Sequence, residues 1–172
     1  MNIDTEEIEE QIDEFLRNLK HGDAEVRLDA VYGLWELEQD SEKVITALLL
    51  ALDDKDKQVR FESALALSGF GRTSEGVIRG LINALKDEED FVRTRSLEEL
   101  GRSGDASEEV IYALLSALKD RSGVVRREAI NSLKKLGQGS VEVINALQKT
   151  LKDDNKSVRE AAGQALAKLE GK

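Results

Sequence analysis

Asp56-Lys57-Gln58-Val59-Arg60-Phe61-Glu62-Ser63-Ala64-Leu65-Ala66-Leu67 is one of five versions of the same phrase in this chain. Its Val-Arg pair recurs every 33 residues, without insertion or deletion. The third residue after each Arg is Ala or Ser, and the seventh is Leu. These offsets place both side chains on one stripe of a helix, with the small residue where two helices approach closely. A fixed period of this length is typical of a solenoid of stacked helical units. The five pairs are Val26-Arg27, Val59-Arg60, Val92-Arg93, Val125-Arg126 and Val158-Arg159.

Other residues with the same period predict where the helices begin and end. A serine precedes each of four apolar runs, as helix N-caps do, and Thr5 is expected to cap the first helix. The residue four positions before each Arg is expected to cap the second helix of its unit. Glycine closes helices because it adopts the left-handed conformation without strain. The predicted caps are Ser41, Ser74, Ser107 and Ser140 for first helices, and Asp23, Asp56, Glu89 (or Asp90 in its place), Ser122 and Asn155 for second helices. The predicted closing glycines are Gly69, Gly71, Gly101, Gly104, Gly137 and Gly139.

The periodicity therefore predicts an all-α fold, an α-solenoid of five two-helix repeats in a single domain spanning residues 1–172. The expected repeats are 5–38, 41–71, 74–104, 107–137 and 140–170. In the first repeat Gln11 and Asp13-Glu14 replace apolar or small residues, as expected of a solvent-facing cap. The last helix, 158–169, has no such polar replacement, which favours either a truncated longer array or a stacking surface.

The overall composition excludes several classes of protein. The 172 residues include 40% hydrophobic and 35% charged residues, which is enough apolar surface for a continuous core. Cysteine is absent, so disulfides and thiolate metal sites are excluded. The acidic start lacks a signal pattern, and the longest apolar run, 47–52, is too short for a bilayer. We expect a cytoplasmic protein with no membrane partner.

The phrase Leu-Lys-Asp, four residues, Val-Arg, two residues and a small residue resembles the short HEAT-like repeats of the phycobilisome-lyase type. Leu85-Lys86-Asp87 with Val92-Arg93 carries the resemblance best, together with its copy 33 residues later. The resemblance covers nearly the whole chain and implies a right-handed superhelix. It also implies that the turn Asp and the helix-start Arg tie neighbouring repeats together by charge-assisted hydrogen bonds. The structural residues so assigned are Arg27, Arg60, Arg93, Arg126 and Arg159 with Asp54, Asp87, Asp120 and Asp153.

Catalytic chemistry has little support in the sequence. His21 is the only histidine, so the di-iron centre that some HEAT-like enzymes hold through repeated His-Glu pairs is excluded. No base is placed to activate a serine, and Gly69-Phe70-Gly71 follows a helix instead of opening one, unlike a phosphate-binding loop. We expect a protein that is not an enzyme and that carries no metal and no cofactor.

The second helices carry the candidate binding surface. In the family that this chain resembles, they line the concave face, and their solvent side falls one, two, five and nine residues after the Arg. These positions differ most between the five copies. The N-terminal half of the face is apolar and aromatic, and the C-terminal half is basic. Tyr32 and Trp35 could instead simply cover the core near the first cap. The residues predicted to bind a partner are Leu28, Tyr32, Trp35, Phe61, Leu65, Arg95, Glu98, Arg102, Arg127, Asn131 and Lys135.

These observations favour a non-enzymatic scaffold that binds a peptide or a partner helix on this concave face. An apolar segment is expected near Tyr32 and Phe61, and an acidic one near Arg95 and Arg127. One alternative is nucleic-acid binding by the basic half, which the net charge of −10 disfavours. Another is a bilin (tetrapyrrole) lyase or chaperone, suggested by the family resemblance alone. The acidic first helix and the lysine-rich end are explained by solubility and by the favourable placement of acids at a helix N-terminus. The alternative explanation is head-to-tail self-association through the terminal repeats.

Overall fold

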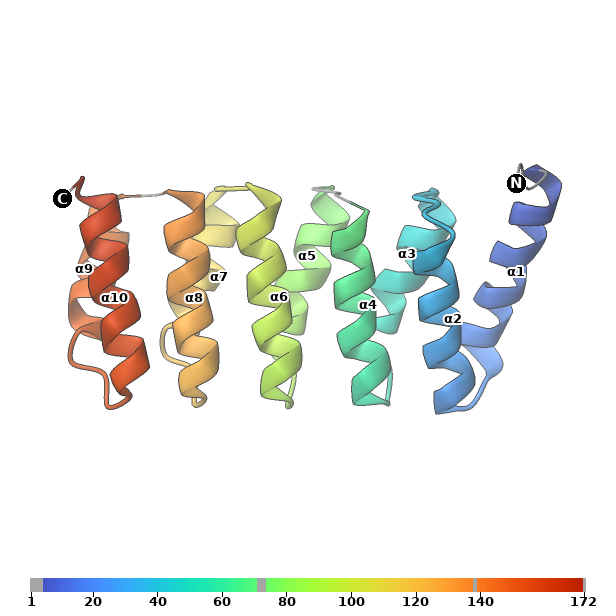
Figure 1. Ribbon diagram of the computed structural model, residues 1–172, viewed down its shortest axis with the longest axis horizontal. Coiled ribbons are helices and arrows are strands. Elements are labelled where there is room, and N and C mark those ends of the chain that lie inside the picture. The colour runs from blue at the N-terminus through green and yellow to red at the C-terminus, as the bar shows by residue number, and fades with distance from the viewer. Residues whose placement is uncertain (1–4, 71–73, 138, 172) are drawn as a thin grey trace. The chain divides into compact units, whose positions relative to one another are not determined.

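The computed structural model describes residues 5–70, 74–137 and 139–171, and within them it contains ten α-helices and no strand (Figure 1). The first helices of the five repeats are α1 (Thr5–His21), α3 (Glu42–Ala51), α5 (Glu75–Ala84), α7 (Glu108–Ala117) and α9 (Val141–Thr150). The second helices are α2 (Ala24–Glu36), α4 (Lys57–Gly69), α6 (Asp90–Ser103), α8 (Gly123–Leu136) and α10 (Lys156–Leu169). The all-α, two-helix repeat architecture predicted from the 33-residue period is therefore confirmed.

The chain forms two compact units, residues 1–80 and 81–172, with the boundary inside α5. In the first unit α2 packs against both α1 and α4, and α3 packs against α4. In the second unit α8 packs between α6 and α10, while α7 and α9 pack against α8 and α10. Figure 1 shows α2 and α4 side by side in the first unit, and α6, α8 and α10 side by side in the second. Second helices thus form one layer of each unit and first helices the other.

The core is built from the positions that recur in the sequence. The small residue and the Leu that follow each Arg are buried in all five second helices. Val44, Val77, Val110 and Val143 are at most 1% exposed at the start of the first helices. Val26 is an exception, because it is 36% exposed whereas its four counterparts are at most 1% exposed. It packs beside Gly22, which has no side chain to cover it.

The N-caps follow the prediction at most positions. Ser74, Ser107 and Ser140 accept hydrogen bonds from the backbone N–H three residues later, at 3.3 to 3.4 Å. Asp23 and Asp56 also accept from the N–H three residues later, and Asn155 accepts from the N–H of Ser157, two residues later.

Three predicted caps are wrong in detail. The Ser41 hydroxyl is buried and makes no capping bond, although the residue stands at the helix start. Glu89 and Ser122 also stand at helix starts without a side-chain cap, and Asp90 is already the first residue of α6. Ser122 instead donates to the Asp90 carboxylate across repeats, at 2.8 Å. The side chain of Thr5 lies outside the described residues.

Only some of the predicted glycines close helices. Gly104 and Gly137 have φ of 74° and 68° and end α6 and α8. Gly69 is the last residue of α4, whereas Gly101 lies inside α6; Trp35 and Ser132 respectively leave no room for a Cβ atom at these positions. In the first repeat the left-handed residue is Glu38, with φ of 51°. Gly139 does not have positive φ, and Gly71 lies outside the described residues.

Candidate functional site

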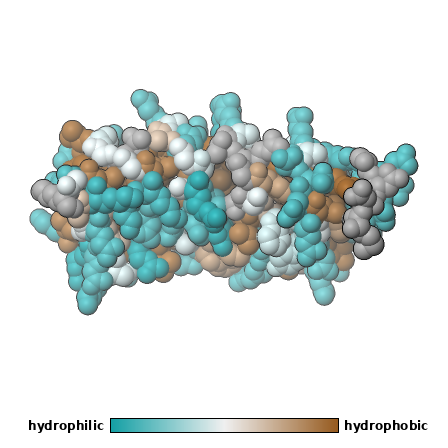
Figure 2. All heavy atoms as spheres, turned by 45° about the horizontal axis from the view of Figure 1, so that its top comes forward, coloured by the Kyte–Doolittle hydropathy of each residue, from teal (hydrophilic) through white to brown (hydrophobic). Residues whose placement is uncertain are grey.

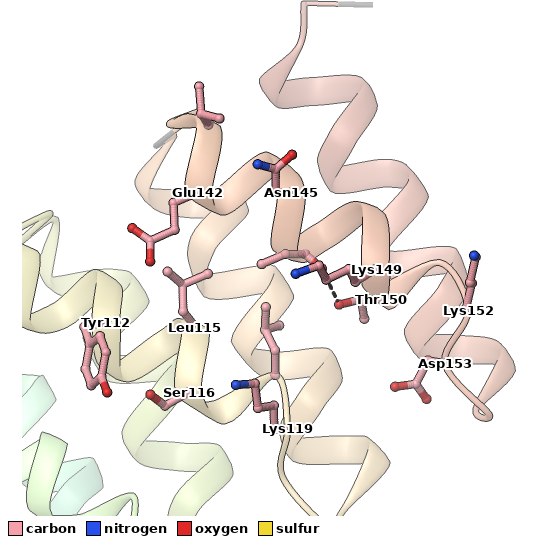
Figure 3. A pocket seen from close by; sticks show the side chains of 13 residues that line it. Tyr112, Leu115, Ser116, Lys119, Glu142, Asn145, Lys149, Thr150, Lys152 and Asp153 are labelled. Atoms are coloured by element: carbon pink, nitrogen blue, oxygen red, sulfur yellow. Dashed lines mark hydrogen bonds between the residues drawn. The ribbon is translucent and has the colours of Figure 1, made fainter.

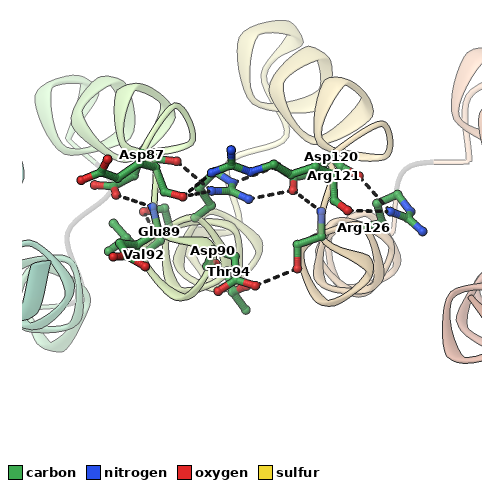
Figure 4. A network of polar contacts seen from close by, with 12 residues as sticks. Asp87, Glu89, Asp90, Val92, Thr94, Asp120, Arg121 and Arg126 are labelled. Carbon is green, nitrogen blue, oxygen red and sulfur yellow. Dashed lines mark hydrogen bonds and ion pairs between the residues drawn. The ribbon is translucent and has the colours of Figure 1, made fainter.

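The arginine and aspartate series forms a row of bonds between successive repeats. Nε and Nη2 of Arg27 donate to the carboxylate of Asp54, both at 2.7 Å. Arg93 binds Asp120 in the same two-pronged way at 2.8 Å, and Arg126 binds Asp153 at 2.7 and 2.8 Å. In each case Nη1 turns back to a backbone carbonyl of its own repeat. Figure 4 shows the part of this row in the second unit, between Asp87 and Arg126.

The hydrogen bonds of this row lower the pKa values of Asp54, Asp120 and Asp153. Burial raises the pKa of Asp54 and Asp120, but the hydrogen bonds from the arginine and from a turn N–H outweigh it and hold both below the usual range. The hydrogen bond from Arg126 lowers the pKa of Asp153 to about 2. These carboxylates are therefore charged near neutral pH and hydrogen-bonded to their arginines, as is expected of structural residues.

The other structural residues lie in the same turns. Arg60 donates through Nη1 to the Asp54 carbonyl at 2.9 Å, and Arg159 donates to the Asp153 carbonyl at 2.7 Å. Asp87 accepts from the N–H of Glu89 at 2.9 Å, which fixes the turn before α6.

On the second-helix face of the first unit, an aromatic patch is formed by Leu28, Tyr32, Trp35, Phe61 and Leu65. Leu28 and Tyr32 of α2 occupy the same repeat positions as Phe61 and Leu65 of α4, and the two helices pack together. Tyr32 and Trp35 are 38% and 45% exposed, and the other three are half-buried. Trp35 also lies against Gly69, so part of its ring covers the end of α4.

Carboxylates surround the aromatic patch. Burial raises the pKa of Tyr32, and a hydrogen bond with Glu62 and the charge of Asp29 raise it further. Asp29 and Glu36 are exposed on α2. The patch therefore combines exposed aromatic surface with negative charge.

Arg95 and Arg102, in the half of the face predicted to be basic, lie beside acids of their own helix. Arg95 is only 20% exposed in its side chain and pairs with Glu98 at 2.8 Å and with Glu99 at 3.0 Å. Arg102 lies 4.0 and 3.8 Å from the same two carboxylates. Neighbouring acids on the same helix thus pair with these arginines at i to i+3 or i+4 spacing.

On α8 the predicted residues have similar neighbours. Asn131 donates to Glu128 at 3.2 Å, and Lys135 lies 4.0 Å from Glu128. Arg127 is exposed. The second-helix face of the second unit is therefore a mixed-charge surface.

A groove between α7 and α9 lies on the first-helix face of the second unit, which the sequence reasoning did not single out (Figure 3). Its volume is about 860 Å³. Tyr112 and Val141 on its rim are 72% and 77% exposed, and Lys119 and Lys149 add positive charge. The equivalent position in other repeats is occupied by the polar residues Thr46, Arg79 and Asn145. An aromatic residue at Tyr112 was therefore the feature of the sequence that could have pointed to this groove.

The first unit has a similar groove of about 770 Å³ between α1 and α3. Leu50 on its rim is 73% exposed, and Lys43 bridges the two helices by ion pairs with Glu9 and Asp13. Figure 2, which shows one face of the molecule, shows hydrophobic side chains reaching the surface among hydrophilic ones.

Neither a metal site nor a membrane span is found within the part of the chain that the structure describes. No group of three or more His, Cys, Asp or Glu side chains is arranged to hold a metal ion there, and His21 is exposed. No helix there is both long and apolar enough to cross a bilayer.

Comparison with known proteins identifies the repeat. A family model described as HEAT repeats matches residues 12–101 and again 78–167. No curated protein sequence matches the chain.

Several solved structures share the fold. The complex of CpcE and CpcF of phycocyanin lyase from Nostoc sp. PCC7120 has a chain with a TM-score of 0.74 and 22% identity. The match covers 94% of this chain but 65% of that one. A designed armadillo repeat protein in complex with the peptide (KR)4 matches with a TM-score of 0.65 and 20% identity, covering 95% of this chain and 86% of that one. A computationally designed armadillo repeat protein for modular peptide recognition gives a TM-score of 0.63 and 19% identity, with coverages of 95% and 86%.

Proposed function

Because the chain belongs to the HEAT-repeat family, we propose that it is a non-enzymatic scaffold that binds a protein segment on its aromatic patch. The observation that carries this proposal is the exposure of Tyr32 and Trp35 beside Phe61 on two packed second helices. Exposed aromatic side chains held on rigid helices are the usual anchors of protein interfaces.

The charges around the patch define the chemistry of the partner. Asp29, Glu36 and Glu62 leave the patch negative, so the matching segment carries apolar or aromatic side chains flanked by lysine or arginine. This differs from the acidic segment expected beside Arg95, since Glu98 and Glu99 already neutralise that arginine. The designed armadillo protein that holds (KR)4 is an instance of a related fold accommodating a basic peptide.

Peptides selected on the intact chain from a random display library test this proposal. Selected peptides should combine aromatic and basic residues, and the double variant Tyr32→Ala, Phe61→Ala should weaken their binding by roughly 30-fold or more, as loss of an interface hot spot does. The chain has a single Trp, so a change of Trp35 fluorescence on binding would report on the patch itself. Tyr112→Ala is the control, because it removes an aromatic residue that is more exposed than Tyr32 and lies elsewhere.

Two results would contradict the proposal. One is a set of peptides whose affinity the double variant leaves unchanged while its circular dichroism shows an intact fold. The other is a loss of binding in the Tyr112→Ala variant, which would assign recognition to the groove between α7 and α9.

A tetrapyrrole-handling role is the second candidate, because one similar solved structure is a phycocyanin lyase complex. At 22% identity this likeness shows the fold alone. Mixing the chain with a bilin tests this role directly. An absorbance change that saturates with protein concentration would support it, and an unchanged bilin spectrum would exclude it.

A further inference from the structure

The groove between α7 and α9 has two apolar rim residues at repeat positions that are otherwise polar. Tyr112 and Val141 are 72% and 77% exposed. Their counterparts in the second to fifth repeats are exposed too, so exposure is a property of these positions in each of those repeats. The apolar residues of two neighbouring repeats thus converge on one groove. The counterparts are Thr46, Arg79 and Asn145 for Tyr112, and Glu42, Glu75 and Glu108 for Val141.

Lysines line the end of the groove where α7 and α9 terminate. Lys119, Lys149 and Lys152 are exposed there, and none of them forms an ion pair with a residue that the structure describes. In the similar groove of the first unit, by contrast, Lys43 is already paired with two carboxylates of α1. Asp153 also lines this end, but it is held by an arginine of α8. The positive charge at this end is therefore available to a ligand.

Carboxylates line the opposite end of the same groove. Glu109 and Glu142 lie in the first turns of α7 and α9, and both border an adjoining hollow of about 700 Å³. This hollow shares Tyr112 and Leu115 with the groove. Figure 3 shows Glu142 and Lys119 at opposite ends, with Leu115 between them. The groove thus has a negative end, an apolar centre and a positive end.

The two walls of the groove have the length of a short helix. α7 and α9 contain 10 residues each. Each is therefore about 15 Å long, which is also the length of about three turns of a partner helix. We propose that the groove binds an amphipathic helix of a partner protein, whose apolar ridge packs on Tyr112, Leu115 and Val141 and whose carboxylates lie at the end facing the lysines. This second binding surface shares no residue with the aromatic patch and takes a segment of the opposite charge.

Two other occupants fit the groove less well. A nucleic-acid strand carries a phosphate at every nucleotide, so Glu109 and Glu142 would repel part of any strand that follows the groove. In a second copy of this chain the acidic helix is α1, but Ile12 on its apolar side is 1% exposed and already buried in its own unit. A helix with its acids confined to one end matches both ends of the groove.

Helices selected on a variant that lacks the aromatic patch test this proposal. A display library of about 12-residue helices, carried on a stable helical scaffold, is panned against the double variant Tyr32→Ala, Phe61→Ala. Selected helices should have apolar residues at i, i+3 or i+4 and i+7, and carboxylates toward one end. Tyr112→Ala, added to the double variant, should weaken their binding by roughly tenfold or more. Lys149→Glu should also weaken binding and reduce its dependence on salt.

Two matched variants serve as controls in the same background. Leu50→Ala removes an apolar residue that is 73% exposed beside the groove of the first unit. Lys168→Glu makes the same change of net charge on α10, away from the lining of the groove. Both should leave the affinity within about twofold of that of the parent, with an unchanged circular dichroism spectrum.

Four results would overturn the proposal. A selection that yields no helix whose binding depends on Tyr112 would show that the groove does not accept a helix. Selected helices without carboxylates would show that the lysines do not choose the ligand. Binding of a DNA or RNA oligonucleotide that Lys149→Glu abolishes would assign the groove to nucleic acid. Self-association in analytical ultracentrifugation that Tyr112→Ala abolishes would assign it to a second copy of the chain.

Discussion

Arg93 and Asp120 show how single side chains join successive repeats. The Arg93 side chain is 4% exposed and binds the carboxylate through two nitrogens at 2.8 Å, while Nη1 closes its own turn. Such a pair makes only a modest net contribution to the free energy of folding, because both charged groups lose their contact with water. Removing one partner is costly, since the other charge stays buried and unpaired.

Asp120→Asn should therefore destabilise the chain by about 2–4 kcal/mol at pH 7. The folded-state pKa of Asp120 is lowered, so its stabilisation is present above the usual pKa of an aspartate and is lost as pH falls through the lower folded value. The difference between variant and parent should then shrink below about pH 4. Denaturant titrations at pH 7 and pH 3 measure both effects.

Asp153→Asn is the comparison variant for that experiment. Arg126 also binds Asp154 at 2.6 Å, so a second carboxylate remains when Asp153 is changed. Its loss of stability at pH 7 should be the smaller of the two. An equal or larger loss would show that Asp154 does not replace Asp153 as the partner of Arg126.

At the scale of the element, the contact of α6 with α8 depends on two small residues that meet. The Ser132 hydroxyl donates to the Leu97 carbonyl at 2.7 Å. A Cβ atom on Gly101 would lie 2.6 Å from the Ser132 hydroxyl oxygen and 2.8 Å from its Cα. This glycine was predicted to close α6, but Gly104 does so, and Gly101 instead allows the two backbones to approach.

Gly101→Ala should destabilise the second unit by about 1–3 kcal/mol, because overpacking outweighs the better helix propensity of alanine. Thermal unfolding followed by circular dichroism measures the change. Glu38→Gly is a useful contrast, because glycine relieves the left-handed strain at φ of 51° and should leave the chain as stable or more stable. A Gly101→Ala variant with unchanged stability would contradict the close approach.

At the scale of the whole molecule, charge decides which classes of partner are favoured. The formal net charge is −10, and two of the arginines predicted to form a basic face, Arg95 and Arg102, are paired with Glu98 and Glu99. Binding to a nucleic-acid backbone requires unpaired cations that can displace counterions. The aromatic patch, with its own surrounding carboxylates, favours a partner of opposite charge.

We therefore expect no binding of duplex DNA at an ionic strength of about 0.15 M. Fluorescence anisotropy of a labelled duplex should stay flat up to high micromolar protein. Arg95 and Arg102 provide the internal check, since their replacement by Ala should change nothing. A rise in anisotropy that weakens with added salt would contradict this expectation.

The 33-residue period alone determined the all-α repeat fold, the helix pairs and the buried stripe, because local spacing decides which side of a helix is apolar. The tertiary structure decided how charges are shared. The sequence predicts Arg95 to be a basic surface residue. In the structure it forms an ion pair with Glu99, which is 3% exposed, and this pairing depends on the geometry of the helix and on how deeply Glu99 is buried. Only the tertiary structure shows that Tyr112 and Val141 border a groove, because this follows from which side chains are neighbours in space.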